Sequence, residues 1–281
     1  IFVFLHMLNL KSTITMNNGI KIPRLGFGVY RAAQGDETKN AVLNALEVGY
    51  RHIDTASAYG NEESVGEAIK ESGLKREEIF LTTKLFNSDM RAHRQMDAFK
   101  ESLDRLKVDY VDLYLIHWPV PGVYLESWKV LEEIYNKGLA KAIGVSNFLQ
   151  HHLDDVIAHG SIVPAANQVE FSPLWQDNLL IQYCREKNIA FEAWGPLAAG
   201  ELIGDRTTGD IGAKYGKTGS QVILRWMLQK NIIVFPKTVH KSRMIENADI
   251  FDFELSDEDM AIIDNMNRHR RTGPDPDNFD F

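Results

Sequence analysis

Cysteine is almost absent from this sequence, and so are long apolar runs and any excess of positive charge. Cys184 is the single cysteine, so no disulfide can form within the chain. Such a chain suits a reducing compartment, and we expect the protein in the cytoplasm. The apolar start, residues 1–8, is much shorter than the ~20 residues of a membrane-spanning helix. The net charge of −8 excludes a general attraction to nucleic acid or to anionic membranes, so neither is expected as a partner.

The length and composition favour a single domain. With 281 residues, 44% of them hydrophobic and 25% charged, the chain can bury one large α/β core. No linker-like stretch, low-complexity segment or charge block divides it, so residues 13–281 are predicted to form one domain. Residues 1–12 lack the basic start and the small-residue cleavage site of a secretory signal. They are predicted to be a disordered or leader extension that adds nothing to catalysis.

A strand-then-helix unit repeats along most of the chain. Before the repeat, Thr13-Ile14-Thr15 and Ile20-Lys21-Ile22 flank Asn17-Asn18-Gly19, which predicts a β-hairpin. The predicted strands of the repeat are 25–28, 52–54, 79–83, 111–116, 142–145, 165–169, 189–193 and 232–235. Each is followed by residues of helical period, and a last helix begins at Ser256. Eight such units predict an α/β fold, a (β/α)8 TIM barrel with an N-terminal β-hairpin and a C-terminal helix and tail.

An open doubly wound sheet is the alternative arrangement of such units. Those sheets usually bind nucleotides through Gly-x-Gly-x-x-Gly after the first strand. Arg31 stands here where the third glycine would be, after Gly26 and Gly28. Gly216-Lys217-Thr218 matches the end of a phosphate-binding loop, but Ile211 takes the place of its first glycine. The barrel is therefore favoured.

Polar side chains follow successive predicted strands, at the end of the barrel where such enzymes carry their chemistry. They are Asp54, with Tyr59 five residues later, and then Lys84 and His117 after the next two strands. Any one of them alone is explained by a turn, a cap or the core, but their coincidence at one rim is not. A phenol has an unperturbed pKa near ~10, and a neighbouring ammonium lowers it. Asp54 would hold Lys84 charged, and His117 would orient a carbonyl. The set predicts Tyr59 as a general acid that protonates a carbonyl oxygen while hydride reaches the carbon.

Residues at the ends of the later predicted strands could bind a nicotinamide cofactor that donates the hydride. The groups able to hydrogen-bond a carboxamide are Ser146, Asn147 and Gln168. Trp194 can stack on a nicotinamide ring. Residues 235–243 form a basic segment in an acidic protein and lead into a predicted helix, which makes them a candidate anion site. A phosphate on the adenosine ribose would account for Lys237 and Arg243 together, so NADPH is predicted rather than NADH.

These residues and the motifs around them resemble the aldo-keto reductase family. The motifs that carry the resemblance are Gly49-Tyr50-Arg51-His52-Ile53-Asp54-Thr55-Ala56, Asp112-Leu113-Tyr114-Leu115-Ile116-His117-Trp118-Pro119, Ile143-Gly144-Val145-Ser146-Asn147-Phe148, Asn167-Gln168-Val169-Glu170 and Pro236-Lys237-Thr238-Val239. They occur in order from about residue 14 to the C-terminus. The resemblance implies a (β/α)8 barrel that reduces carbonyls with NADPH.

The resemblance also implies roles for individual residues. The family's catalytic positions match Asp54, Tyr59, Lys84 and His117. The positions around the nicotinamide match Ser146, Asn147, Gln168 and Trp194, with Gly195 and Leu197 beside them. The positions at the 2′-phosphate and adenine match Lys237, Thr238, Val239, Arg243, Glu246 and Asn247. No metal is implied, and a monomer acting on a small-molecule carbonyl is expected.

One branch of the family is the most similar, through Asn247 to Leu255 and Gly273 to Asp277. It holds 2,5-diketo-D-gluconate reductases, methylglyoxal reductases and protozoan prostaglandin F synthases. The chain departs from the family's common pattern at Ala58, Gly60, Phe86, Ser172 and Gly195. These departures leave the identity of the substrate open, but they do not affect the expected hydride chemistry. Broad specificity is expected, for 2-oxoaldehydes such as methylglyoxal, aromatic aldehydes, keto sugars or keto sugar acids, and prostaglandin H2.

The substrate pocket is predicted from residues after strand ends, and two other functions stay open. The predicted pocket residues are Tyr30, Phe86, His117 and Trp118. In the first alternative, Lys84 is the Schiff-base lysine of a barrel aldolase or lyase. In the second, the chain is a non-catalytic NADPH-binding protein, an alternative that an intact Asp–Tyr–Lys–His set disfavours.

Overall fold

The computed structural model describes residues 8–281, so part of the predicted extension at residues 1–12 lies outside the described residues. The predicted hairpin is confirmed: β1 (Thr13–Thr15) and β2 (Lys21–Pro23) pair antiparallel. Amides of the turn tie it to the barrel, since Asn17 and Asn18 donate to the carbonyls of Pro164 and Lys141. The hairpin therefore covers the barrel at the start of its strands, the end opposite the candidate site.

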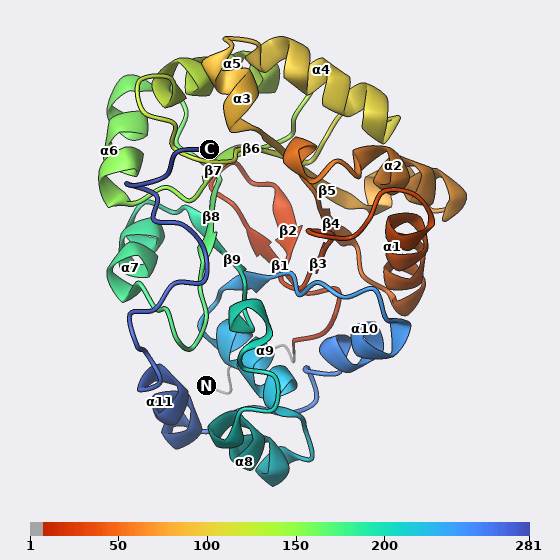
Figure 1. The fold of residues 1–281 in the computed structure, drawn as a ribbon, viewed down its shortest axis with the longest axis vertical. Helices are drawn as coiled ribbons and strands as arrows, with labels where there is room; N and C mark the ends of the chain where they lie inside the picture. The colour runs from red at the N-terminus through yellow and green to blue at the C-terminus, as the bar shows by residue number, and fades with distance from the viewer. Residues whose placement is uncertain (1–7) are drawn as a thin grey trace, which may run out of the picture.

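Eight parallel strands form the barrel (Figure 1). They are β3 (Phe27–Gly28), β4 (His52–Asp54), β5 (Phe80–Leu85), β6 (Leu113–Ile116), β7 (Ile143–Ser146), β8 (Ala166–Glu170), β9 (Ala190–Trp194) and β10 (Ile233–Val234). Each strand hydrogen-bonds the next in chain order. Parallel bridges from Leu25 to Val234 and from Gly28 to Lys237 join the first strand to the last. The predicted barrel is confirmed, and every strand's C-terminal end reaches the same rim.

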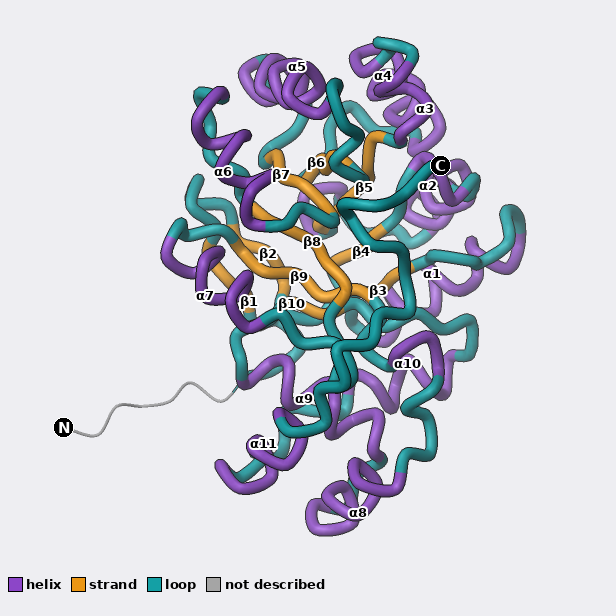
Figure 2. Tube along the Cα trace, turned by 60° about the vertical axis from the view of Figure 1, so that its left-hand side comes forward, coloured by secondary structure: helices purple, strands orange, loops and turns teal. Residues whose placement is uncertain are grey.

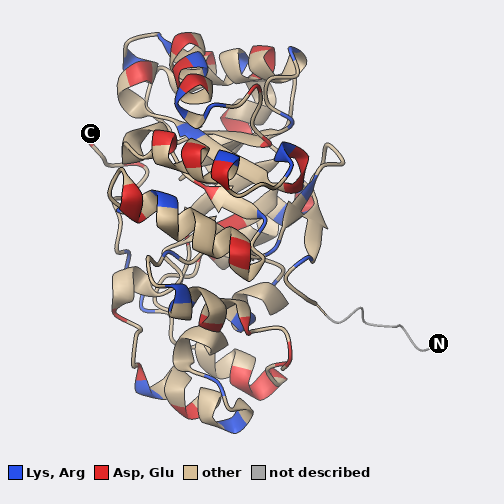
Figure 3. Cartoon of the chain, turned by 90° about the vertical axis from the view of Figure 1, so that its right-hand side faces the viewer, with Lys and Arg blue, Asp and Glu red and all other residues tan. Residues whose placement is uncertain are grey.

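Helices surround the strands (Figure 2). They are α1 (Asp36–Val48), α2 (Glu62–Glu71), α3 (Asn87–Arg91), α4 (Gln95–Leu106), α5 (Tyr124–Asn136), α6 (Gln150–His159), α7 (Asn178–Glu186), α8 (Arg206–Tyr215), α9 (Gly219–Gln229), α10 (Lys241–Ala248) and α11 (Asp257–Asp264). Acidic and basic residues are interspersed along them (Figure 3). Among residues 8–281, no helix is both long and apolar enough to cross a bilayer.

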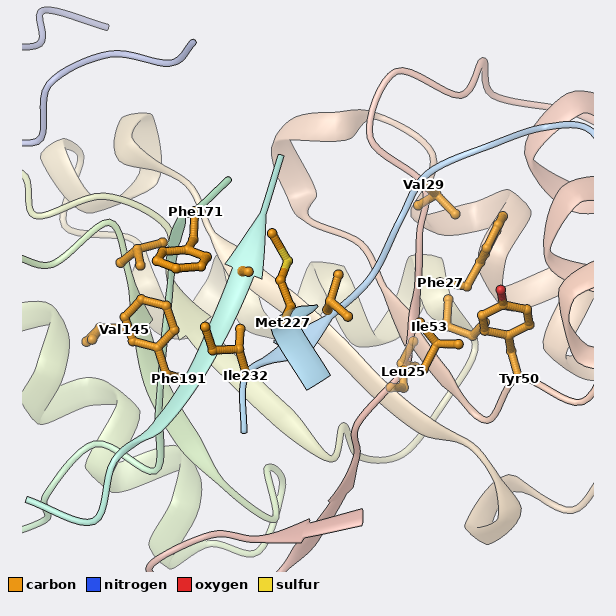
Figure 4. Packing of buried hydrophobic residues seen from close by; sticks show 14 of the residues in the cluster. Leu25, Phe27, Val29, Tyr50, Ile53, Val145, Phe171, Phe191, Met227 and Ile232 are labelled. Carbon is orange, nitrogen blue, oxygen red and sulfur yellow. The ribbon is translucent and has the colours of Figure 1, made fainter. Parts of the chain in front are cut away.

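The main core lies between the strands and the helices that surround them. Figure 4 shows part of it, with Phe171 and Phe191 in one group and Phe27 and Tyr50 in another. The ring of Phe171 stacks on Trp226 of α9 at a centroid distance of 5.2 Å. Burial of this kind contributes about 25 cal/mol for each Å² of apolar surface removed from water. This packing fixes the strand ends, and so the side chains at the rim.

The connection between β9 and α9 contains a helix that the periodicity did not predict. Asp205 caps α8 by accepting a hydrogen bond from the Thr208 amide at 2.9 Å. Two glycines within the helix hide its pattern. One of them, Gly212, lies so close to Lys217 that a Cβ would stand 2.3 Å from the Lys217 carbonyl oxygen. The glycine that suggests a loop is thus required by close packing of a helix.

Candidate active site

A buried ion pair lies at the C-terminal rim and reaches a phenol. Lys84 on β5 donates from Nζ to Asp54 Oδ1 at 2.7 Å and to the Thr55 carbonyl at 2.9 Å. The same ammonium lies 3.3 Å from the hydroxyl of Tyr59. Asp54 ends β4, and Tyr59 ends the short 3₁₀ helix η1 (Ser57–Tyr59). The structure therefore brings together three of the four predicted catalytic residues through direct contacts.

Asn61 holds the turn that carries Tyr59. Its amide donates to the carbonyls of Val29 and Ala32 at 2.9 and 3.1 Å, and its Oδ1 accepts from the Thr55 hydroxyl. The turn is also tied to β5, because the Ser57 hydroxyl donates to the Lys84 carbonyl at 2.9 Å. Asn61 stands at the N-cap position of α2, where asparagine commonly bonds a backbone amide of the helix, yet its side chain makes no capping bond. Nothing in the sequence pattern reveals its role in positioning the turn.

His117, the fourth predicted residue, follows β6 and faces Tyr59. The two rings lie 5.7 Å apart, edge to face. Burial lowers the pKa of His117 well below its usual value, and the nearby charge of Lys84 lowers it further. The ring is therefore neutral at physiological pH, and its Nδ1 has no hydrogen-bond partner among residues 8–281. A neutral imidazole can still donate one hydrogen bond.

The charge states of Lys84 and Tyr59 follow from opposing effects. Burial alone would lower the pKa of Lys84, but Asp54 and Tyr59 outweigh it and the pKa is raised. Burial also raises the pKa of Tyr59 to about 12, although Lys84 acts in the predicted opposite direction. Tyr59 thus keeps its proton at neutral pH. A permanently charged Lys84 is unsuited to Schiff-base chemistry, which needs the neutral amine.

The predicted nicotinamide ligands form one hydrogen-bonded group on β7, β8 and β9. The Ser146 hydroxyl donates to the Gln168 carbonyl at 2.8 Å, and the Asn147 amide donates to Ser146 Oγ at 3.2 Å. The Trp194 indole donates to Asn147 Oδ1 at 2.9 Å. Gly195 follows with φ of +67°, a conformation that favours glycine, and Leu197 lies two residues further along the chain. These side chains lie at the same rim as the Asp54–Lys84 pair.

Glu192 is a buried carboxylate to which the sequence reasoning gave no role. Gln168 donates one amide hydrogen to Asp54 Oδ2 and the other to Glu192 Oε2, both at 2.8 Å. The Glu192 side chain is fully buried, and burial raises its pKa to about 7. The signal in the sequence is an acidic residue within the apolar strand 189–193.

The predicted phosphate and adenine residues lie together on one segment after β10. Lys237, Thr238 and Val239 follow the strand, and Arg243, Glu246 and Asn247 lie on α10. Lys237 and Arg243 are exposed, and neither forms an ion pair within the described part of the chain. Thr238 and Asn247 are buried, and Glu246 accepts from the Thr218 hydroxyl at 2.8 Å. The segment offers two unneutralised cations at the start of a helix.

Aromatic rings border the Tyr59 hydroxyl, and the tail covers some of them. Tyr30 lies 5.0 Å from the Tyr59 ring and Phe86 lies 5.8 Å from His117. Trp118 is buried, because Phe279 and Phe281 each pack 5.2 Å from it. The tail residues were missed as site candidates. Figure 1 shows the tail in dark blue, running over that end of the barrel.

A cavity of about 400 Å³ lies beside this region, lined by Gln34, Ser57, Ala58, Gly60, Glu62, Glu63, Phe86, Ser88, Asp89, Glu101 and Arg105. None of Asp54, Tyr59, Lys84 and His117 lines it. It therefore adjoins the predicted substrate pocket through Phe86 but is separate from the reacting groups.

Polar side chains of the barrel and its helices anchor the tail, and Glu170 and Asp277 take part in two of these anchors. Glu170 on β8 accepts from the Thr272 amide and hydroxyl at 2.5 and 2.6 Å. Asp277 contacts His151 and His152 at 3.0 and 3.4 Å, a set whose spacing could hold a metal ion. The Nδ1 of His152 accepts from the Leu149 amide, however, so the ring proton lies on Nε2, where it faces Asp277 as a donor. The group is better explained as a hydrogen-bonded tail anchor.

A closed parallel barrel with an acid, a lysine, a tyrosine and a histidine at its C-terminal rim is the arrangement of a barrel enzyme. The chain belongs to the aldo/keto reductase family, whose sequence profile matches residues 24–268. It is 47% identical to the glyoxal reductase of Bacillus subtilis (strain 168), over 97% of this chain and 99% of that protein.

Two further comparisons agree. The chain is 46% identical to a 9,11-endoperoxide prostaglandin H2 reductase of Trypanosoma cruzi (strain CL Brener), over 95% of both chains. Its structure superposes on that of a Gox0644 mutant in complex with NADPH with a TM-score of 0.91 and 40% sequence identity, covering 96% of this chain and 99% of the other. The family predicted from the motifs is confirmed, and the chain spans nearly the full length of these relatives.

Proposed function

We propose that this protein is an NADPH-dependent reductase of aldehydes and ketones in which Tyr59 is the general acid. The observation that carries the proposal is the ammonium of Lys84, held 2.7 Å from Asp54 and 3.3 Å from the Tyr59 hydroxyl. Membership of the aldo/keto reductase family supports it. The same contacts support a catalytic protein over a non-catalytic binding protein, because a buried ion pair beside a phenol is costly to maintain for binding alone.

Residues of the chain itself deliver the proton that the carbonyl oxygen receives during reduction. Tyr59 donates its hydroxyl proton to the carbonyl oxygen of the substrate, and Lys84 stabilises the phenolate that remains. The neutral ring of His117 donates a hydrogen bond to the same oxygen and so orients the carbonyl. NADPH, when bound, supplies the hydride.

The residues around the rim fit that cofactor. Because the carboxylate of Asp54, paired with Lys84, only accepts hydrogen bonds, Gln168 turns its NH₂ toward Asp54 and Glu192, which leaves its Oε1 to accept from a carboxamide N–H. The Ser146 hydroxyl and the Asn147 amide donate to the carbonyls of Gln168 and His117, so each would exchange such a bond for one to the carboxamide. Trp194 supplies a flat ring for stacking. Lys237, Thr238, Val239 and Arg243 are proposed to bind the 2′-phosphate, and Glu246 and Asn247 the adenine.

Replacing Arg243 with alanine tests the phosphate site. The exposed guanidinium has no ion-pair partner among the described residues, so its loss should leave the fold unchanged. Charged hydrogen bonds contribute about 1.5 to 3 kcal/mol, so NADPH affinity should fall by about tenfold or more, while NADH affinity changes little. Fluorescence titration with both nucleotides measures this. The neighbouring exposed Ser242→Ala serves as a control, and an equal loss for NADPH and NADH would remove the 2′-phosphate assignment.

The proposed substrates are small dicarbonyls and aldehydes, with broad tolerance. The two relatives are named for glyoxal reduction and prostaglandin H2 reduction, which supports a pocket that accepts unlike substrates. The test is an NADPH oxidation assay across methylglyoxal, nitrobenzaldehyde, keto sugars, keto sugar acids and prostaglandin H2. We expect turnover of several of them. Reduction of a single sugar acid, with methylglyoxal and nitrobenzaldehyde ignored, would overturn broad specificity; no NADPH oxidation with any of them would overturn the proposed function.

We further propose that the active form is a monomer in the cytoplasm, built from one domain at residues 13–281. Of the predicted extension, residues 8–12 lie within the described part of the chain, and Leu8 and Leu10 pack against the main core. They are proposed to support the fold without contributing to catalysis.

A further inference from the structure

Glu192 is a fully buried carboxylate that the proton chemistry above does not use. It lies on β9 in register with Gln168 of β8, which is itself in register with Ser146 of β7. Residues paired in register point to the same side of a parallel sheet, so the three side chains form one row on the inner wall of the barrel. Trp194 lies two residues further along β9, on the same face and nearer the rim.

Two carboxylates converge on one amide in this row. The NH₂ group of Gln168 donates to both Asp54 and Glu192, and Glu192 Oε1 has no hydrogen-bond partner among residues 8–281. An amide group has only two donor hydrogens. Both are used below the rim, so the orientation of Gln168 is fixed by its neighbours, and Glu192 is the neighbour that Lys84 does not neutralise.

We propose that Glu192 is a positioning residue for the nicotinamide. It holds Gln168 with Oε1 toward the cofactor's carboxamide. Glu192 is also ionised when the oxidised, positively charged nicotinamide is bound, and protonated when the neutral reduced form is bound. This rests on the proposed function, because it requires Gln168 to be a carboxamide ligand.

The charges in the barrel interior explain why the proton on Glu192 should respond to the ring. Asp54 and Lys84 are the charged groups that act on Glu192, and they shift its pKa in opposite directions. An ionised Glu192 is then a buried charge without a partner, which is unfavourable. The other strand beside β9 contributes Ile233 and Val234, which carry no charge, and α7 packs on the outer side of the barrel. A positively charged oxidised nicotinamide would supply the missing partner, and the neutral reduced ring would not.

The protonation of Glu192 determines how the affinity for the oxidised cofactor changes with pH. Burial raises the pKa of Glu192 to about 7 in the free protein, and a positive ring nearby lowers that pKa. NADP⁺ should therefore bind with release of protons from Glu192 near neutral pH. The affinity for NADP⁺ relative to NADPH should rise with pH through the neutral range and level off above it. Taking the ratio of the two affinities removes the titration of the 2′-phosphate, which both forms share.

The experiment compares three proteins by equilibrium binding of NADP⁺ and NADPH between acid and alkaline pH. In the wild type, the affinity ratio should change by about tenfold for each unit by which the ring displaces the pKa. Glu192→Gln keeps an acceptor for Gln168 and should bind both forms, but its ratio should not depend on pH. Glu192→Leu removes the acceptor and should weaken both forms by up to about tenfold, the effect of one hydrogen bond.

Glu62→Gln is the matched control. Glu62 is also a buried carboxylate, but it lies on α2 and is bonded by Thr83, Ser102 and Arg105 outside the barrel interior. Its variant should keep the wild-type pH dependence. Calorimetry of the wild type in buffers of different ionisation enthalpy supplies a measurement that needs no variant, and should detect more protons released with NADP⁺ than with NADPH, the difference being the protons lost by Glu192.

The outcomes separate the two proposals. A wild-type protein that binds neither nucleotide overturns the proposed function and this inference with it. An affinity ratio with the same pH dependence in Glu192→Gln as in the wild type, or equal proton release with NADP⁺ and NADPH, overturns the role of Glu192 and leaves the reductase proposal intact.

Discussion

Replacing Tyr59 with phenylalanine is expected to lower reductase turnover by at least ~10²-fold, the lower range for losing a general acid. The substitution removes the hydroxyl next to Lys84 but keeps the ring, which packs 5.0 Å from Tyr30 and 5.7 Å from His117. The fold and the nicotinamide ligands should therefore be unaffected, and NADPH should bind as it does to the wild type. Initial rates of NADPH oxidation with methylglyoxal measure the first quantity, and fluorescence titration measures the second.

Tyr114→Phe is the control for this experiment. Tyr114 is another buried tyrosine of the barrel, on β6, and its hydroxyl has no hydrogen-bond partner among the described residues. Its loss should leave turnover unchanged, which shows that removing a buried hydroxyl does not by itself impair the enzyme. Turnover in Tyr59→Phe equal to that of the wild type would exclude Tyr59 as the acid and would redirect attention to His117.

The rim residues were predictable because of how parallel strands repeat. Asp54, Lys84 and His117 stand at the ends of successive apolar runs, and a closed parallel barrel brings all such ends to one rim. The bond from Gln168 to Asp54 was not predictable, since it crosses the barrel interior between residues 114 positions apart. That contact depends on closure of the barrel, which no local pattern encodes. The role of Glu192, which bonds the same Gln168 amide, was not predictable for the same reason.

Burial and backbone conformation account for other features of the structure that the sequence alone did not predict. The sequence indicates that Lys84 lowers the pKa of Tyr59, but only the structure shows that burial outweighs it. Asp36 is an ordinary capping residue by type, yet it is the first residue of α1, and Gly35 takes the cap position with φ of 99°. A C-terminal tail was predicted from the sequence, but it has no periodicity, so the packing of Phe279 and Phe281 on Trp118 was not predictable.

Replacing Lys84 with methionine should have a large effect on both stability and turnover. Methionine has a similar length but no charge, and it leaves the carboxylate of Asp54 buried without its partner. Breaking a buried ion pair by removing one member costs about 3 to 5 kcal/mol. Turnover should fall by at least ~10²-fold, because Tyr59 loses the cation that stabilises its phenolate. Urea denaturation and NADPH oxidation measure the two effects.

The double variant Asp54→Asn with Lys84→Met separates stability from catalysis. It removes both charges of the pair, and replacing a buried pair by neutral groups is often close to neutral for stability. Most of the lost free energy of unfolding should therefore return, and Gln168 can still donate to the asparagine oxygen at position 54. Turnover should stay as low as in Lys84→Met, since no cation remains beside the phenol. If turnover recovered together with stability, Lys84 would be a structural residue and the proton would have to be managed without it.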